Sequence, residues 1–425
     1  MSKQFRSVIQ LENAVKELKE ARHFLRHKKI KPAEKEINDS LAFIGRALRT
    51  IQQEFGVTTT IFNFTGGLQT FVTPSDGTLK VQTIGAAGGS TLDAAGGRGA
   101  SIAFDFPINA GETLAILVGG QGGSTSGGGG AAGGGGGSFV WRGTTFSDLT
   151  ADTLIVAAGG GGGGGNGGGN DERNGVDATI NSSGTAGGYP GAGSGGTDGN
   201  GGGGSQLTTD IATAGGGGAG VFGDGGNGLS FPPDAFGGAG GTAIVHGATG
   251  GSGGSGGAAG GFGGGGGGGG LAYGGGGGGG GYSGGGAGGG GAQDGPGGGG
   301  GSFSIIGASQ VNTAGVGTGN GTVTITFVPA RITLNITQTA SFTFQLTGNV
   351  TVSGVPAQGV PVTFTFFVGT GTVSISPNPA MTDASGNFAA TLNLSGTGPT
   401  VFGYVDASAL FNGTTISARQ FINIA

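Results

Sequence analysis

Several residue types that usually carry chemistry or anchor a chain are scarce in this sequence. There is no cysteine among the 425 residues, which excludes disulfides, thiol chemistry and thiolate metal sites. No stretch is long and apolar enough to cross a membrane. The first residues are charged and are followed by Glu12, Lys16 and Glu17, a pattern unlike a secretory signal. We therefore expect no membrane span and, if the protein is exported, another route.

Catalytic side chains are equally rare. His23 and His27 stand four apart and could share a metal ion, but the sequence favours a solvated pair, and His246 has no recognisable partner. The Gly-x-Gly-x-x-Gly pattern recurs through composition alone, and no Gly-Lys-Ser/Thr phosphate loop accompanies it. A minor alternative is a calcium site in the glycine- and asparagine-rich turns, from the following acidic residues: Asp171, Asp177, Asp198 and Asp224. We expect no enzyme, no cofactor and no bound metal.

The N-terminal part, residues 1–56, differs from the rest in charge and pattern. Its formal charge is +5, whereas the remainder carries −10. Two apolar series at spacings of three and four predict amphipathic helices with coiled-coil seams. These seam residues are Val8, Leu11, Val15, Leu18 and Leu25 in the first series and Ile37, Leu41, Ile44, Leu48, Ile51 and Phe55 in the second. Because such short helices need partners, we expect an oligomerisation or anchoring segment, with a trimer as the first choice.

The basic turn between these two predicted helices has a second reading. Arg26, Lys28, Lys29 and Lys31 could bind nucleic acid. A charge run at a helix–helix turn is more often solvated, so we expect no nucleic-acid partner.

Glycine dominates the centre of the chain. Of 115 glycines, 103 lie between Gly66 and Gly321. Such composition usually marks a flexible linker, and ordering it costs roughly 1–2 kcal/mol per residue. Three features argue against a linker: only 10% of all residues are charged, apolar strand-like runs lead directly into the glycines, and single aromatics punctuate the runs. These aromatics are Phe139, Trp141, Phe222, Phe231, Phe236, Phe262, Tyr273, Tyr282 and Phe303.

A glycine run has one ordered option of its own, the polyproline II helix with three residues per turn. Its N–H and C=O groups point outward, so neighbouring helices without Cβ atoms can bond one another laterally. We therefore expect a bundle of polyglycine II helices on a β-strand template, with aromatics plugging its ends and flanks.

The motifs around the glycines point to a known family. The relevant stretches are Ile61–Gly66, Gln69–Val72, Leu79–Gly89, Gly119–Gly123, Gly133–Trp141, Leu154–Gly165, Gly297–Phe303 and Gly319–Phe327. They resemble the glycine-rich extracellular domain of the anaplastic lymphoma kinase and leukocyte tyrosine kinase receptors, over about residues 58–329. The resemblance implies a β-sandwich-like template decorated by polyglycine helices. The cysteines, membrane span and kinase of those receptors are absent, so signalling is not implied. The helix packing also resembles, more loosely, the tip adhesins of T-even-like bacteriophages.

The last part of the chain reads as short strands separated by turns, which predicts a β-sandwich. Three of its stretches, Gly359–Phe364, Thr382–Phe388 and Val401–Ala407, resemble bacterial Ig-like repeats of the invasin and intimin type. That resemblance implies a surface module of bacterial or phage origin.

Together these observations predict a mainly β protein in three parts. They are a helical coiled-coil or hairpin at 1–56, a glycine-rich β/polyglycine II domain at 57–330 and an Ig-like β-sandwich at 331–425. The preferred function is a structural component of a bacterial surface or spore appendage, partnered by itself and by other surface proteins. The alternative is a phage tail-fibre tip or adhesin that recognises a glycan or protein receptor on a cell. Both place the protein at an extracellular, cell, spore or virion surface.

Overall fold

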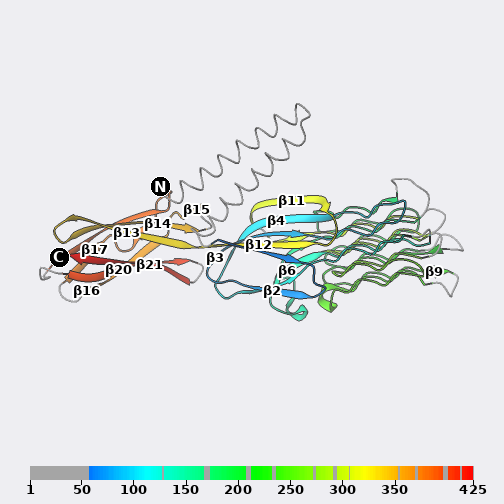
Figure 1. The fold of residues 1–425 in the computed structure, drawn as a ribbon, viewed down its shortest axis with the longest axis horizontal. Coiled ribbons are helices and arrows are strands. Elements are labelled where there is room, and N and C mark those ends of the chain that lie inside the picture. The colour runs from blue at the N-terminus through cyan, green and yellow to red at the C-terminus, as the bar shows by residue number, and fades with distance from the viewer. Residues whose placement is uncertain are drawn as a thin grey trace, which may run out of the picture.

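The computed structural model describes residues 57–424, except for short gaps. These gaps are 127–128, 167–172, 207–211, 232–235, 271–273, 291–293, 306, 353–354, 369–371, 396–400 and 412–413. Two β-sandwiches and a body of glycine segments follow one another along the long axis of the molecule (Figure 1).

The helical part of the expected fold class is wrong for the described chain. The described residues contain no α-helix, only 3₁₀ turns such as η1 (Phe146–Asp148) and η3 (Ile244–His246). They hold no coiled coil, while the β-rich part of the expectation agrees with the sheets found. Residues 1–56, with the eleven seam positions from Val8 to Phe55, lie outside the described residues. The physical reason is that apolar residues of the described chain alternate with polar ones, as at Leu79 and Val81, and this period of two forms strands rather than helices. Within the described chain, no helix has the length and hydropathy to span a membrane.

The first sandwich begins with an antiparallel sheet in the order β1–β12–β3–β4–β11. Its strands are β1 (Thr58–Asn63), β3 (Gly77–Ile84), β4 (Gly99–Ile108), β11 (Ala308–Gly317) and β12 (Thr322–Pro329). The middle strands alternate in burial, as in β3, where Leu79 and Val81 point inward and Lys80 and Gln82 outward. Such alternation is typical of an antiparallel sheet with one face on the core and one face exposed to solvent.

The second sheet lies between that core and the glycine segments. Its order is β10–β7–β6–β5–β2, with β2 (Leu68–Val72), β5 (Thr113–Leu117), β6 (Ser138–Arg142), β7 (Leu154–Ala158) and β10 (Phe303–Ser304). Leu114, Ile116 and Val140 face the first sheet in one apolar cluster. Leu117 and Trp141 belong to another cluster on the opposite face. Because both faces are covered, β7 is buried at every position and its sequence is continuously apolar.

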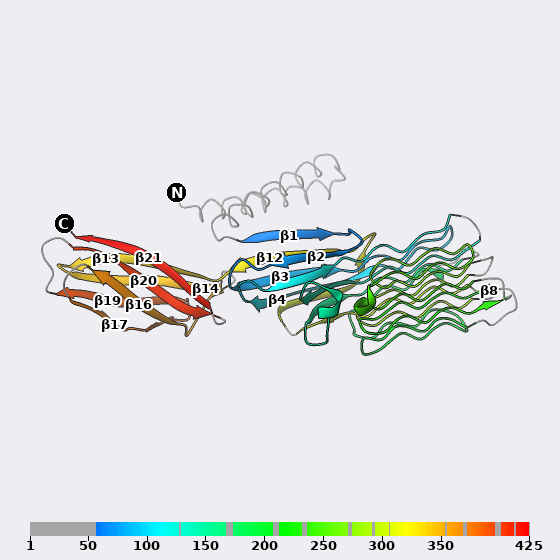
Figure 2. The same cartoon turned by 90° about the horizontal axis from the view of Figure 1, so that it is seen from below.

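The glycine segments continue from strands of the first sheet and of this middle sheet, and they run back and forth toward the far end of the molecule (Figure 2). The short pair β8 (Ala212–Thr213) and β9 (Ser230–Phe231) lies at that far end. Near the middle sheet, turns of the glycine segments supply Val221, Ile244 and Ala248 to the cluster around Trp141. The glycine body is therefore seated on an apolar platform.

The C-terminal sandwich has its own core. One sheet has the order β13–β14–β19–β17, with β15 beside β14, and the other β18–β16–β20–β21. The strands are β13 (Arg331–Ala340), β14 (Thr343–Val352), β15 (Val355–Pro356), β16 (Pro361–Val368), β17 (Thr372–Ser376), β18 (Ala380–Met381), β19 (Asn387–Ser395), β20 (Val401–Phe411) and β21 (Thr414–Ile424). Leu346, Leu392 and Val405 are fully buried between the sheets. Only Ala330 separates β12 from β13, and its N–H donates to the Asp76 carbonyl.

Candidate functional site: the glycine lattice

We use the name glycine lattice for the hydrogen-bonded extended segments between Gly85 and Ser302 that continue from strands of both sheets of the first sandwich. Its central segment, residues 274–281, donates its N–H groups with a period of three. Three successive N–H groups donate to three different neighbouring segments, and the next three donate to the same segments in the same order. The donor–acceptor pairs are Gly276–Gly295 and Gly279–Gly298, Gly277–Ala132 and Gly280–Gly135, and Gly278–Gly216 and Gly281–Ala219, at 2.8–3.2 Å. This is the periodicity of a polyproline II helix.

The carbonyl groups of the same segment repeat the pattern toward three other neighbours. They accept N–H groups in the following pairs: Gly275 from Gly269 and Gly278 from Gly266, Gly276 from Gly288 and Gly279 from Gly285, and Gly277 from Gly163 and Gly280 from Gly160. The segment is thus surrounded by six others and its backbone groups are paired with them. Glycine here builds a body rather than a linker.

Close approach explains why these positions hold glycine. A Cβ atom at Gly277 would stand 2.1 Å from the Gly266 carbonyl oxygen, and one at Gly163 would stand 2.2 Å from the oxygen of Ala132. Real Cβ atoms do not come so near to backbone oxygen. The lattice therefore excludes every L side chain at such positions, because backbone faces backbone on all sides.

At the margin of the lattice, side chains take the place of missing neighbours. The Asn174, Asp177 and Asn227 Oδ1 atoms accept the N–H groups of Ala95, Arg98 and Gly240, at 2.7, 2.6 and 2.9 Å. Short polar side chains are suited to such local bonds with backbone N–H groups. Such residues are also common in turns, so the sequence analysis missed their capping role.

The acidic residues weighed as calcium ligands are partly used in this way. The Asp224 carboxylate accepts the Ala243 N–H at 2.6 Å and pairs with His246 Nδ1 at 3.0 Å. These bonds, that of Ala243 first, lower the pKa of Asp224. His246 therefore has a partner that the sequence did not reveal. Asp171 lies outside the described residues, and those that are described include no group of three or more potential metal ligands.

The aromatic residues near the middle sheet plug the lattice as expected. Phe139 and Trp141 are fully buried, and Phe222, Phe262, Tyr282 and Phe303 pack against the same cluster. The Tyr282 and Phe303 rings stack with centroids 4.9 Å apart. Phe236 does not follow this rule, because it is 72% exposed, and the side chains of Phe231 and Tyr273 lie outside the described part.

One ion pair is buried in the lattice away from the platform. Arg173 Nη1 lies 3.6 Å from Asp294 Oδ2, and the Asp294 side chain is only 2% exposed. Burial raises the pKa of Asp294 to about 7, against the opposing effect of the Arg173 charge. Among the described residues, Asp294 Oδ1 and Arg173 Nε find no hydrogen-bond partner. The pair therefore carries an electrostatic cost when the carboxyl group is ionised.

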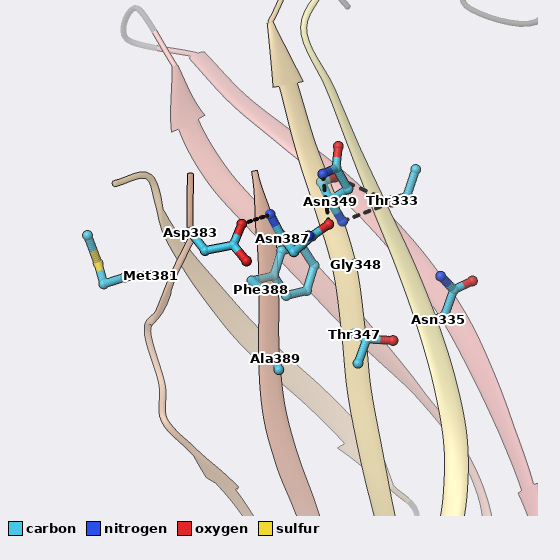
Figure 3. Close-up of a pocket in the computed structure, with 10 residues that line it drawn as sticks. All are labelled: Thr333, Asn335, Thr347, Gly348, Asn349, Met381, Asp383, Asn387, Phe388 and Ala389. Atoms are coloured by element: carbon cyan, nitrogen blue, oxygen red, sulfur yellow. Dashed lines mark hydrogen bonds between the residues drawn. The ribbon is translucent and has the colours of Figure 1, made fainter. Parts of the chain in front are cut away.

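A second candidate surface is a polar hollow on the C-terminal sandwich, of about 600 Å³. Figure 3 shows Asn335, Asn349 and Asn387 on neighbouring strands and Asp383 beside them. Asn349 Nδ2 donates to Asn387 Oδ1 at 3.0 Å, and Asp383 Oδ1 accepts the Asn387 N–H at 2.9 Å. Phe388 also lines the hollow but is only 3% exposed, so it offers little aromatic surface beside the amide and carboxylate groups.

Comparison with known proteins places the chain in no family. It matches no protein-family model and, at a significant level, no curated protein. The resemblances to the receptor glycine-rich domain and to Ig-like repeats stay predictions, and function must be argued from the geometry.

Proposed function

We propose that this protein is a structural component of a bacterial surface or spore appendage. In this proposal the glycine lattice is a rigid body and the C-terminal sandwich is an exposed module. Partners would be further copies and other surface proteins.

The observation that carries the proposal is the saturation of the lattice by backbone hydrogen bonds. The interior of this body is held mainly by backbone hydrogen bonds, and the body extends in line with two sandwiches (Figure 1). Ordering it costs a large conformational entropy, which is difficult to explain for a spacer that a flexible linker could replace. Stiffness and extension are the properties that the lattice adds.

Electron microscopy with an antibody against the C-terminal sandwich tests this function. Gold label along filaments or over the surface of cells or spores, with matching elongated particles in the purified protein, is the expected result. Label confined to the cell interior would contradict it.

The alternative function is recognition of a cell-surface receptor, as in an adhesin or phage tail-fibre tip. The polar hollow of Figure 3 favours it, because amide and carboxylate groups suit hydroxyl-rich ligands such as glycans. A glycan array tests it with Asn335→Ala, inside the hollow, and Asn312→Ala, exposed on β11 outside it. Binding that only the first variant loses would support recognition, and a blank array would count against this hollow as a glycan site.

A further inference from the structure

The outer margin of the glycine lattice contains a groove of about 520 Å³. Residues 227–228, 236–239 and 252–255 line it, and we call it the lattice groove. Three adjacent extended segments of the lattice thus leave a hollow between them. Glycine backbone lines the hollow together with the side chains of Asn227, Phe236, Ala239, Ser252 and Ser255.

The segment that forms one wall bonds both to the lattice interior and to the neighbouring groove segment, where the Ser255 N–H donates to the Phe236 carbonyl and the Ser252 carbonyl accepts the Ala239 N–H. Gly251 and Gly254 donate to Gly265 and Gly268 at 2.8 and 2.9 Å. Gly250 and Gly253, each one residue earlier, have neither N–H nor C=O bonded to any described group. Backbone groups in the interior are paired at a spacing of three residues. At the surface, Gly250 and Gly253 keep this spacing of one turn, but their groups are unpaired.

The opposite wall differs. The Asn227 side chain caps Gly240 and the Asn227 N–H bonds to no described group, but the Asn227 carbonyl oxygen lies against Gly204, which does not line the groove. At the rim, Phe236 is 72% exposed. Aromatic residues beside a groove are the usual companions of polyproline II recognition.

We propose that the lattice groove binds an extended, glycine-rich strand of a partner protein as one more member of the lattice. The strand has polyproline II geometry, so that its N–H and C=O groups meet the unpaired groups of Gly250 and Gly253 with the same period. The residues of the strand that face the walls are glycines, because a Cβ atom there would clash with the backbone of the walls, as it would inside the lattice. The long runs of the described chain are already bonded within their own lattice, which favours a strand from a different protein. This inference does not depend on the proposed function.

The test uses nuclear magnetic resonance of the full chain with glycine-selective ¹⁵N labelling. The probe is the peptide (Gly-Gly-Ser)₄ at millimolar concentration, and the matched control is (Ala-Ala-Ser)₄. The expected result is a saturable shift of the Gly250 and Gly253 amide signals with the glycine peptide alone. The interior Gly277 signal stays unchanged and reports that the lattice is intact.

Two variants connect the shift to the groove. Ser252→Trp fills the hollow and should raise the apparent Kd at least tenfold, whereas Leu92→Trp, at an exposed position outside it, should leave the Kd unchanged. Equal binding of the alanine peptide, equal binding by Ser252→Trp, or no shift at all would overturn the proposal. Concentration-dependent shifts without peptide would overturn it too, by making a second copy the occupant.

Discussion

An interior glycine of the lattice is defined by the atoms around it rather than by its own flexibility. Gly277 has neighbouring backbone within 3 Å of its absent Cβ atom in two directions, at Gly266 and Gly134. Gly129, in the same glycine-rich part, has nothing within 4 Å. An added methyl group would therefore clash with backbone at Gly277 and meet open space at Gly129.

We predict that Gly277→Ala lowers the free energy of unfolding by on the order of 3 kcal/mol, through overpacking and lost amide pairing. Gly129→Ala should change it by less than about 0.5 kcal/mol. Urea unfolding measures both. Amide hydrogen exchange across 253–301 should be slow in the parent and faster in Gly277→Ala, and random-coil exchange in the parent would show a tether instead of a lattice.

A second residue-scale prediction concerns pH. The pKa of Asp294 is about 7 in the folded protein, against an ordinary value of 3.8. The folded state therefore binds the proton more tightly, and stability falls as pH rises through this window. Asp294→Asn keeps the neutral form, so it should match the parent near pH 4 and exceed its stability by a few kcal/mol at pH 8. Urea unfolding at both pH values checks this, and a parent that is the more stable at pH 8 would contradict it.

At the scale of elements, the middle sheet joins the sandwich to the lattice. Trp141 is fully buried there, and its Nε1–H donates to the Thr145 carbonyl at 3.0 Å. We predict that Trp141→Ala lowers the unfolding free energy by about 3–5 kcal/mol. Phe236→Ala, at the exposed aromatic of the lattice margin, should change it by less than about 0.5 kcal/mol. Thermal unfolding compares the two variants. Similar losses of stability in both would contradict the assignment of Trp141 to the apolar platform under the lattice.

Sequence patterns predicted strands where apolar runs lead into the glycines. Leu154, Ile155 and Val156 form such a run before Gly159, and they lie in the buried strand β7. Sequence could not tell which glycine runs are neighbours, because identical residues carry no information about register or partner. It also could not separate an Asn that caps a lattice edge from one that forms a turn, since both need the same short amide.

On the scale of the whole molecule, two separate cores are joined through one residue. Leu392 lies in the core of the C-terminal sandwich, and Trp141, the only tryptophan, lies in the other part. We predict that tryptophan fluorescence and circular dichroism give non-coincident urea transitions. Leu392→Ala should shift the dichroism transition by about 3 kcal/mol and leave the fluorescence transition in place. A single coincident transition would mean that the two cores unfold together.

The backbone bonding of the lattice also affects how stability depends on temperature. Unfolding an ordinary domain exposes apolar surface and raises the heat capacity by about 12–15 cal/mol/K per residue, while exposed polar surface lowers it. The lattice buries peptide groups and few large apolar side chains, so its heat-capacity increment per residue should lie below that range. A small increment flattens the curve of stability against temperature. The glycine body should consequently keep its rigidity over a wider span of temperature, warm and cold, than the sandwiches that flank it.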